Sequence, residues 1–304
     1  ERSGQDKNEA LYLNVQARGA VLQDTVQTAL VHALQSLPIA KMMHYQVKQS
    51  DGTLEDVEFA RPAHRIVALH GATALQIHAL GIDSANQTEG HRFLAPSVLT
   101  ISDADQYAAQ LLKNKVMANF NERRATIEAE LLKAANGDTV LMPSNLLDEV
   151  TALVEWPTVY ACHFDAEFLE VPQECLILTM QTNQKYFALT DATGKLRNRF
   201  LIVSNIETTT PQSIIQGNER VVRPRLSDAR FFFQQDQKRP LSSRVADLDK
   251  VVYHNQLGTQ LERTKRVGAI ATSIASELQS KGAKVDPKQV ARAAELAKTD
   301  LLTD

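Results

Sequence analysis

The chain has 304 residues, of which 43% are hydrophobic and 23% are charged, and its formal net charge at pH 7 is -3. This length and apolar content can bury a large core in one large domain or two smaller ones, which excludes a disordered chain. The slight acidity excludes the pervasive positive field of a small nucleic-acid-binding domain, so any contact with phosphate must come from a local patch.

The low cysteine count suits a reducing compartment, and the hydropathy pattern gives no membrane span. Cys162 and Cys175 fit no metal-ligand spacing and lie among apolar neighbours, so we expect buried, reduced thiols. No window approaches the roughly 18 to 20 apolar residues that cross a bilayer, and the first ten residues are polar, unlike a secretion signal. We therefore expect a cytoplasmic location and no membrane contact. The missing initiating Met and the final "AKTDLLTD" suggest a piece of a longer chain.

The first part of the chain predicts a strand, a helix and a hairpin. Apolar and polar residues alternate over 10–17, and helical spacing then continues to a stop at Pro38. "RIVALHGATALQIHALGI", residues 65–82, predicts two short apolar strands around His70 and Gly71.

The middle of the chain predicts more helices and a second hairpin. Helical spacing over 102–135, without Pro or Gly, predicts one long helical segment. Ser144 caps the next helix, which Trp156 and Pro157 end, and "TVYACHF" then predicts a strand. Pro172 opens the short helix "QECLILTMQ". The clearest hairpin consists of "KYFALT", the turn "DATGK" and "RFLIVSNI".

From Leu241 onward the pattern is helical, and we place a boundary near Pro240. The predicted fold class is α+β. Residues 1–240 form a mixed-sheet domain with a helical insertion at about 102–150, and residues 241–304 begin an all-helical domain.

Few residues fit a self-contained active site. The histidines form no HExxH zinc motif, and the chain has no Walker loop, dinucleotide fingerprint or GxSxG elbow. His70 and His78, beside the first hairpin, are expected to be structural. In "EGHRF", residues 89–93, Glu89 could orient His91 for proton transfer. The favoured alternative is a polar corner that holds two strands together.

The segment "GNERVVRPRLSDARFFFQQD", residues 217–236, concentrates arginine and phenylalanine. Six basic and three acidic side chains over 217–239 leave a local excess of +3. Pro224 and Ser227 are suited to begin a helix at "SDAR", with Phe233 on its apolar face. We expect the three consecutive phenylalanines, Phe231 to Phe233, to lie in the core.

The arginines of this segment allow two interpretations. They could pair with nearby carboxylates and brace the fold. Alternatively, the helix could offer a row of guanidinium groups to a polyanion, because arginine binds phosphate through a planar fork of donors that lysine lacks.

At these residues the sequence resembles the β subunit of the bacterial heterotetrameric glycyl-tRNA synthetase. Other motifs occur in the same order as in that family: "GHRF" (90–93), "LVEWP" (153–157), "NQKYF" (183–187), "VSNIE" (203–207), and "LGT" followed by "ERTKR" (257–266). The resemblance covers the chain from about residue 10 onward.

The resemblance implies a division of labour between two subunits. In that family the α subunit activates glycine with ATP and Mg, and the β subunit is required for tRNA binding and for assembly of the α2β2 enzyme. It implies the α subunit and glycine tRNA as partners, and neither a cofactor nor a catalytic residue in this chain. The candidate nucleic-acid contacts are Arg220, Arg223, Arg225 and Lys185.

The resemblance also implies two modules. The N-terminal portion of such subunits is similar to the module of the phenylalanyl-tRNA synthetase β subunit that is associated with editing, and the helical portion is similar to an HD domain. HD phosphohydrolases bind metal through a His-Asp pair. If "AKTDLL" is the corresponding place, Thr299 replaces the histidine, so we expect no metal.

Two other functions stay open. One is a hydrolase that deacylates mischarged tRNA through Glu89, His91 and Arg92, which rests mainly on fold analogy. The other is a structural scaffold that binds the α subunit without touching RNA. Such a scaffold need not expose the arginine row.

Overall fold

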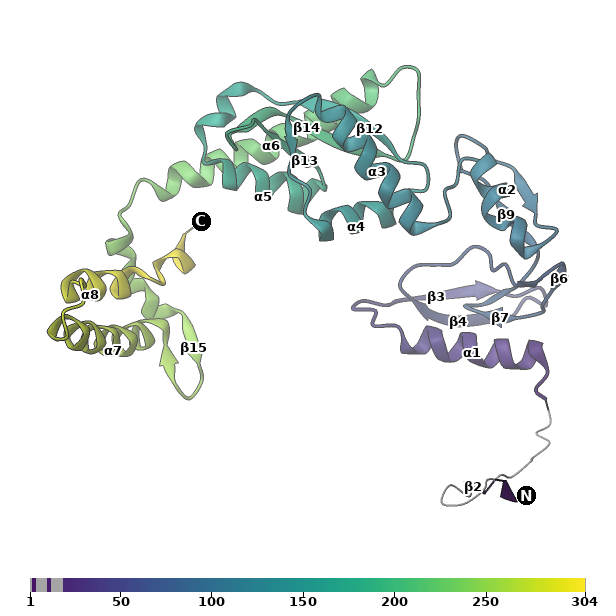
Figure 1. The fold of residues 1–304 in the computed structure, drawn as a ribbon, viewed down its shortest axis with the longest axis horizontal. Coiled ribbons are helices and arrows are strands. Elements are labelled where there is room, and N and C mark those ends of the chain that lie inside the picture. Colours follow the sequence, from purple (N-terminus) through teal and green to yellow (C-terminus); the bar gives the residue numbers. More distant parts are fainter. Residues whose placement is uncertain (1, 4–9, 12–18, 304) are drawn as a thin grey trace. The chain divides into compact units, whose positions relative to one another are not determined.

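The computed structural model describes residues 2–3, 10–11 and 19–303 (Figure 1). The fold is α+β. Contacts divide the chain into two compact units: unit 1 comprises Glu1–Thr126, Thr151–Pro157 and Asn205–Glu207, and unit 2 comprises Ile127–Val150, Thr158–Ser204 and Thr208–Asp304. The predicted boundary near Pro240 and the predicted insertion are not tested by this division and stay predictions.

The sheets are small and antiparallel, so the expected mixed sheet is wrong for the described part of the chain. All named strands there pair in antiparallel fashion, and the parallel contact between Val67 and Ala85 is an isolated bridge. None of the described helices is both long and apolar enough to cross a membrane.

Unit 1 contains a hairpin of two longer strands and one long helix. β3 (Met43–Lys48) pairs with β4 (Leu54–Phe59), and α1 (Leu22–Ser36) lies alongside them (Figure 1). As predicted, α1 ends shortly before Pro38. The strand expected over 10–17 falls outside the described residues except for Ala10–Leu11, which forms β2 and pairs with β1 (Arg2–Ser3).

Short hairpins complete the sheet structure of unit 1. The predicted hairpin around Gly71 is confirmed by β5 (Leu69–His70) and β6 (Thr73–Ala74). Two further pairs follow: β7 (His78–Ala79) with β8 (Ile82–Asp83), and β9 (Gln87–Glu89) with β10 (Val98–Thr100). Gly81, with a φ of +73°, lets the β7–β8 turn approach β3 closely, since an added Cβ would lie 2.9 Å from Val47.

The segment expected to be one helical stretch over 102–135 forms two α-helices. A short 3-10 turn, η1 (Ala104–Gln106), leads into α2 (Tyr107–Lys113), and α3 runs over Phe120–Ala135. The break follows Lys115, whose φ of +61° is left-handed. The N–H of Val116 donates a hydrogen bond to the carbonyl of Leu111 and so ends α2. No Pro or Gly marks this break in the sequence.

Unit 2 contains a four-stranded sheet of order β11-β13-β14-β12. Its strands are β11 (Thr139–Val140), β12 (Thr158–His163), β13 (Phe187–Thr190) and β14 (Leu196–Ser204). The predicted β13–β14 hairpin and the predicted strand β12 are confirmed. In the hairpin turn, the Asp191 carboxylate accepts the N–H groups of Thr193 and Lys195, and Gly194 has a φ of +82°.

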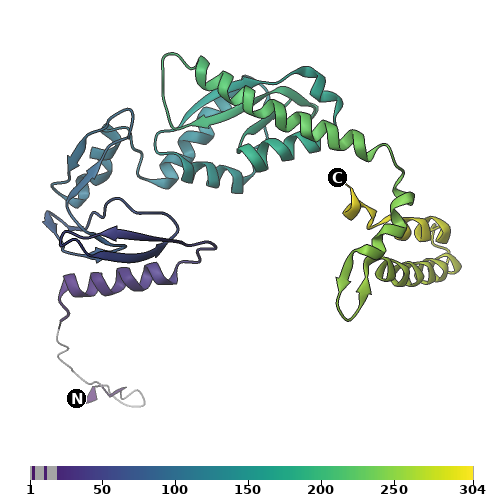
Figure 2. The same ribbon diagram turned by 180° about the vertical axis from the view of Figure 1, so that it is seen from behind.

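Helices cover both faces of this sheet. In Figure 1 α3 passes in front of the sheet and α6 behind it, and in Figure 2 the order is reversed. The core between the sheet and the helices α5 (Gln173–Gln184) and α6 (Gln212–Asp236) includes Phe200, Val222 and Leu226. Successive strand residues point to opposite faces of the sheet, and residues of the other face, such as Phe187 and Leu201, are also fully buried. The remaining elements between β11 and β13 are α4 (Ser144–Leu153) and the 3-10 helix η2 (Ala166–Glu170).

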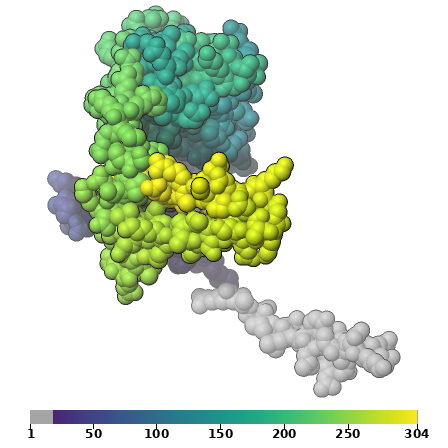
Figure 3. Space-filling view, turned by 90° about the vertical axis from the view of Figure 1, so that its left-hand side faces the viewer, coloured from purple at the N-terminus to yellow at the C-terminus, as the bar shows by residue number. Residues whose placement is uncertain are grey.

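The last part of unit 2 is helical except for one hairpin, so the expectation of a wholly helical segment is wrong there. The 3-10 helix η3 (Leu241–Lys250) precedes β15 (Val252–His254) and β16 (Gly258–Thr259). Thr259 and Glu262 then form a capping box at the start of α7 (Gln260–Ser280). α7 packs against α8 (Pro287–Leu296), and η4 (Thr299–Leu302) follows; Figure 3 shows this last part of the chain in yellow-green to yellow.

His78 links three elements of unit 1. Its backbone N–H and carbonyl are both bonded to the side chain of Gln27 on α1, at 2.8 and 2.7 Å. Its imidazole lies between two carboxylates, with Nδ1 2.7 Å from Asp83 on β8 and Nε2 2.9 Å from Glu55 on β4. The hydrogen bond to Asp83 raises the pKa of His78, and Glu55 adds to the rise against the opposing effect of burial.

This geometry predicts a pH-dependent contribution to the stability of unit 1. Because the folded chain holds the proton more tightly, the contribution is complete below about pH 6.5, the pKa of an unperturbed histidine, and is lost as the pH rises through the raised folded pKa. The effect is small because the imidazole is half exposed. The free energy of unfolding of the native chain and of His78→Gln should differ more in acid than in alkali. His70→Gln, which replaces an exposed histidine outside this network, serves as the control, and an equal response of both variants would contradict the assignment.

Candidate nucleic-acid surface on helix α6

α6 is one continuous helix from Gln212 to Asp236, so the expected helix start at "SDAR" is wrong. Pro224 lies inside it and has no N–H to bond the carbonyl of Arg220, which ordinarily costs about 3 kcal/mol. The helix persists because Val222 and Leu226, on either side of the proline, are fully buried against the sheet. Tertiary packing thus outweighs the local helix-breaking signal.

Two polar residues that sequence reasoning missed fix the position of α6. The Tyr186 hydroxyl, next to β13, donates to Oδ1 of Asn218 at 2.7 Å, and burial raises the pKa of Tyr186 to about 12. The backbone N–H of His163, at the end of β12, donates to Oε1 of Glu219 at 2.8 Å. The "GNER" motif therefore includes two anchors. The partners Tyr186 and His163 are distant in the sequence, so the motif alone does not predict these contacts.

Two arginines of α6 brace the helix against η2 and the residue before it. The Arg223 guanidinium binds both oxygens of Asp165, at 2.8 and 3.3 Å, and 65% of its side chain is still exposed. Arg230 pairs with Glu167 at 3.1 Å and lies over the Phe168 ring, 5.7 Å from its centroid. For these two side chains, the interpretation as partners of nearby carboxylates is correct.

The other two arginines keep their guanidinium groups free. Arg220 and Arg225 are exposed, and neither side chain forms an ion pair or hydrogen bond with any residue that the structure describes. They lie five residues apart, which places them about 140° apart around the helix axis. The sequence-predicted row is therefore split over different sides of α6.

Lys185, the fourth predicted contact, does not join the arginines of α6. It ends α5 in a left-handed conformation, with a φ of +59°. Its ammonium group is 3.0 Å from the carboxylate of Glu149 on α4. A phosphate at this position would have to compete with an ion pair that already exists.

The expected burial of three consecutive phenylalanines is wrong for two of them. Phe231 is 53% exposed and Phe232 is 45% exposed, whereas Phe233 packs against the core. Successive residues of a helix are separated by about 100° around its axis, so three neighbours cannot share one buried face. The two exposed rings touch edge to face, with centroids 5.4 Å apart.

The catalytic interpretation of "EGHRF" is contradicted by the contacts of its side chains. Glu89 pairs with Arg65 at 2.6 Å. His91 is fully buried; its Nε2 donates to the carbonyl of Asn205 at 2.7 Å, and its Nδ1 accepts the N–H of Leu94 at 3.1 Å. Both ring nitrogens are thus engaged by the backbone. The favoured alternative, a polar structural corner, agrees with this geometry.

The same corner joins three motifs that are far apart in the sequence. Oδ1 of Asn205 accepts the N–H groups of Glu155 and Trp156, at 2.7 and 2.9 Å. The Trp156 indole N–H donates to Glu207, and Lys115 also binds that carboxylate, each at 3.1 Å. The bond from Trp156, followed by the interaction with Lys115, lowers the pKa of Glu207. "GHRF", "LVEWP" and "VSNIE" therefore meet in one hydrogen-bonded junction within unit 1.

Thr299 and the two cysteines, for which no metal or reactive thiol was expected, have structural surroundings. Thr299 is fully buried, and its hydroxyl donates to the carbonyl of Leu296 at 2.7 Å. No group of three or more His, Cys, Asp and Glu side chains converges as metal ligands in the described part of the chain, and the expectation of no metal stays a prediction. Both cysteines are free; Cys162 is buried, which raises the pKa of its thiol to about 12, and Cys175 is half-buried.

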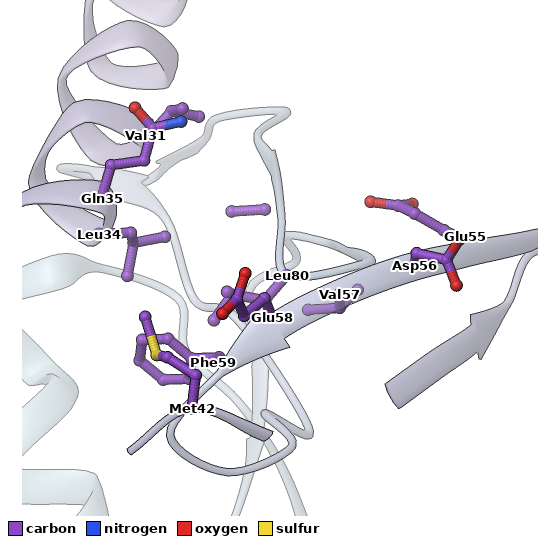
Figure 4. A pocket seen from close by; sticks show the side chains of 11 residues that line it. Val31, Leu34, Gln35, Met42, Glu55, Asp56, Val57, Glu58, Phe59 and Leu80 are labelled. Atoms are coloured by element: carbon purple, nitrogen blue, oxygen red, sulfur yellow. The ribbon is translucent and has the colours of Figure 1, made fainter. Parts of the chain in front are cut away.

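Two hollows on the part of the surface that the structure describes are large enough for a small ligand. In unit 1, a groove of about 460 Å³ lies between α1 and β4 (Figure 4). Two of its carboxylates already have partners, since Glu55 contacts His78 and Asp56 accepts a hydrogen bond from Gln46. A hollow of about 510 Å³ between α7 and α8 is lined mainly by small side chains. Neither hollow brings together the side chains that a catalytic site would need.

The contrast between the enclosed core beneath α6 and the exposed face of α6 predicts a large difference between two truncations, one on strand β14 and one on the helix. Phe200→Ala should lower the free energy of unfolding by about 3 to 5 kcal/mol, because its ring is fully enclosed. Phe231→Ala should change it by only about 1 kcal/mol or less, because about half of its ring faces solvent. Urea unfolding of both variants measures the difference. A similar loss in both would contradict the exposed position of Phe231.

Comparison with known proteins places the whole chain in one group. Residues 1–304 match the family model described as glycyl-tRNA synthetase beta subunit. The chain is 58% identical over 305 residues to a protein of Ralstonia nicotianae named glycine–tRNA ligase beta subunit, and 53% identical over 310 residues to a protein of the same name from Delftia acidovorans. Each match covers 100% of this chain but only 42% and 43% of the respective relative. The chain thus spans less than half the length of these relatives.

Proposed function

Because the chain belongs to the family of glycyl-tRNA synthetase beta subunits, we propose that it forms part of the tRNA-binding, assembly-supporting β subunit of a glycine–tRNA ligase. The observation that carries this proposal is the match of the entire chain, at 58% identity, to a protein with that name. The complete enzyme would join glycine to its tRNA with ATP and Mg, in a cytoplasmic α2β2 assembly whose catalytic site is on the α subunit.

The same family relationship suggests two modules in this chain. The α+β part would correspond to the editing-type module of the phenylalanyl-tRNA synthetase β subunit, and 241–304 would correspond to the start of an HD-like domain. Thr299 supports a domain without metal, because its hydroxyl is bound to the backbone and points to no ligand set. We propose no cofactor in this chain.

The free arginines of α6 support a role in tRNA binding. Arg220 and Arg225 present uncompensated guanidinium groups to solvent, and such groups bind phosphate through paired hydrogen bonds. Arg223 and Lys185 remain in the proposed contact set, but each must exchange a carboxylate partner for a phosphate. They should therefore contribute less than the two free arginines.

The salt dependence of tRNA binding tests this proposal. Each phosphate contact contributes about 0.7 to 0.9 to the slope of log affinity against log salt concentration. Arg220→Ala and Arg225→Ala, in the complete α and β assembly, should each weaken the binding of glycine tRNA. Each should also flatten the slope by the amount that one phosphate contact contributes. Arg223→Ala, in which a paired arginine is lost, serves as the matched control with a smaller change. Unchanged slopes for Arg220→Ala and Arg225→Ala would contradict the proposed RNA contacts.

The division of labour predicts that this chain does not activate glycine. Purified chain alone should show no glycine-dependent exchange of pyrophosphate into ATP, because the proposed adenylation site lies on the other subunit. Adding the α subunit with a full-length β subunit provides the positive control. Exchange catalysed by the isolated chain would overturn the assignment of the chemistry.

A tRNA deacylase is disfavoured as an alternative because the ring nitrogens of His91 are both occupied by backbone groups. A scaffold that never touches RNA is distinguished by the slope measurement described above. Neither alternative gains a specific supporting contact from the described residues.

A further inference from the structure

The exposed side of α6 carries two aromatic rings that do not contribute to the core. Phe231 and Phe232 are about half exposed and contact each other edge to face at 5.4 Å. Burying a phenylalanine is worth roughly 1.5 to 3 kcal/mol, so two adjacent exposed rings forgo a substantial stabilisation. Phosphate binding by arginine does not require them.

Each exposed ring lies in line with one free arginine. Phe231 follows Arg220 by eleven residues, and Phe232 follows Arg225 by seven, so each pair returns to within about 20° of the same side of the helix. The rise of the helix separates Arg220 from Phe231 by about 16 Å and Arg225 from Phe232 by about 10 Å. Two parallel rows therefore run along α6, each with a guanidinium at one end and a ring at the other.

The pattern of this face differs from that of a helix that docks on another protein. Such a helix presents apolar residues at every third or fourth position. The exposed face of α6 also carries Val221, but the polar residues Arg225, Ser227 and Asp228 interrupt the apolar spacing between it and the two rings. By contrast, α7 exposes an apolar series with the required spacing, namely Val267, Ile270, Ile274 and Leu278.

Free guanidinium groups combined with exposed aromatic rings match the chemistry of unpaired nucleic acid. Single-strand sites hold the backbone with cations and stack bases on aromatic side chains, whereas bases inside a duplex cannot reach such rings. We propose that Phe231 and Phe232 stack unpaired RNA bases while Arg220 and Arg225 bind phosphates of the same strand. This inference rests on the proposed tRNA-binding function and specifies which part of an RNA the surface accepts.

The test compares two probes and two double variants of the 304-residue chain. The probes are a short, unstructured RNA oligonucleotide and the same strand annealed to its complement. Phe231→Leu/Phe232→Leu keeps apolar surface but removes both π faces, and Phe231→Tyr/Phe232→Tyr keeps the π faces. Because all four replacements are at exposed positions, an unchanged thermal midpoint confirms that each variant is folded.

The native chain should bind the single strand more tightly than the duplex. The leucine variant should lose about tenfold in affinity for the single strand per stacked base, while its salt slope and its duplex binding stay unchanged. The tyrosine variant should bind like the native chain. Arg220→Ala/Arg225→Ala should instead flatten the salt slope for both probes.

The outcomes separate this inference from the proposed function. Native-like single-strand binding by the leucine variant, or an equal loss in the tyrosine variant, overturns stacking while leaving the arginine contacts intact. Unaltered slopes in the arginine variant, or no binding of either probe by the native chain, overturn the RNA function and the inference together. Failure of a full-length leucine variant to assemble with the α subunit, with RNA binding unchanged, would identify a protein-docking face and also overturn the inference.

Discussion

The packing of α6 on the sheet of unit 2 determines what this region can offer to a partner. Val222 and Leu226 are fully buried in the core that also includes Phe200. Their burial fixes the rotation of the helix about its axis, since the helix can turn only by removing both side chains from the core. Once that rotation is set, the direction of every other side chain on α6 is set as well, including the free arginines and the exposed rings.

Polar contacts then secure the orientation that apolar packing selects. Asn218 and Glu219 tie the helix to the ends of two strands, and Arg223 and Arg230 tie it to the segment containing η2. Exposed ion pairs of this kind contribute about 0 to 1 kcal/mol each, so they position the helix more than they stabilise the fold. An arginine-rich motif can therefore serve two roles, with paired side chains holding a rigid helix and unpaired ones available for a ligand.

Local patterns in the sequence predicted most elements, because hairpins and capped helices depend on neighbouring residues. The hairpin with "DATGK" and the stop of α1 before Pro38 are examples. The failures have both non-local and local causes. Packing carries α6 through Pro224, a left-handed Lys115 separates α2 from α3, and the helical period turns Phe231 and Phe232 outward. The sequence left both interpretations of the arginines open, because their separation into paired and free groups depends on carboxylates about sixty residues away.

The buried junction at His91 shows why a recognisable motif is not by itself a functional site. Residues of "GHRF", "LVEWP" and "VSNIE" meet through backbone hydrogen bonds to His91 and Asn205, and these bonds use the groups that catalysis would require. His91 is fully buried, so the loss of either of its hydrogen bonds would leave an unpaired polar group inside the fold, which is costly. The free guanidinium groups of Arg220 and Arg225 on α6 make no contact that the fold requires. Their presence on the surface therefore points to binding, whereas the junction at His91 is explained by the architecture alone.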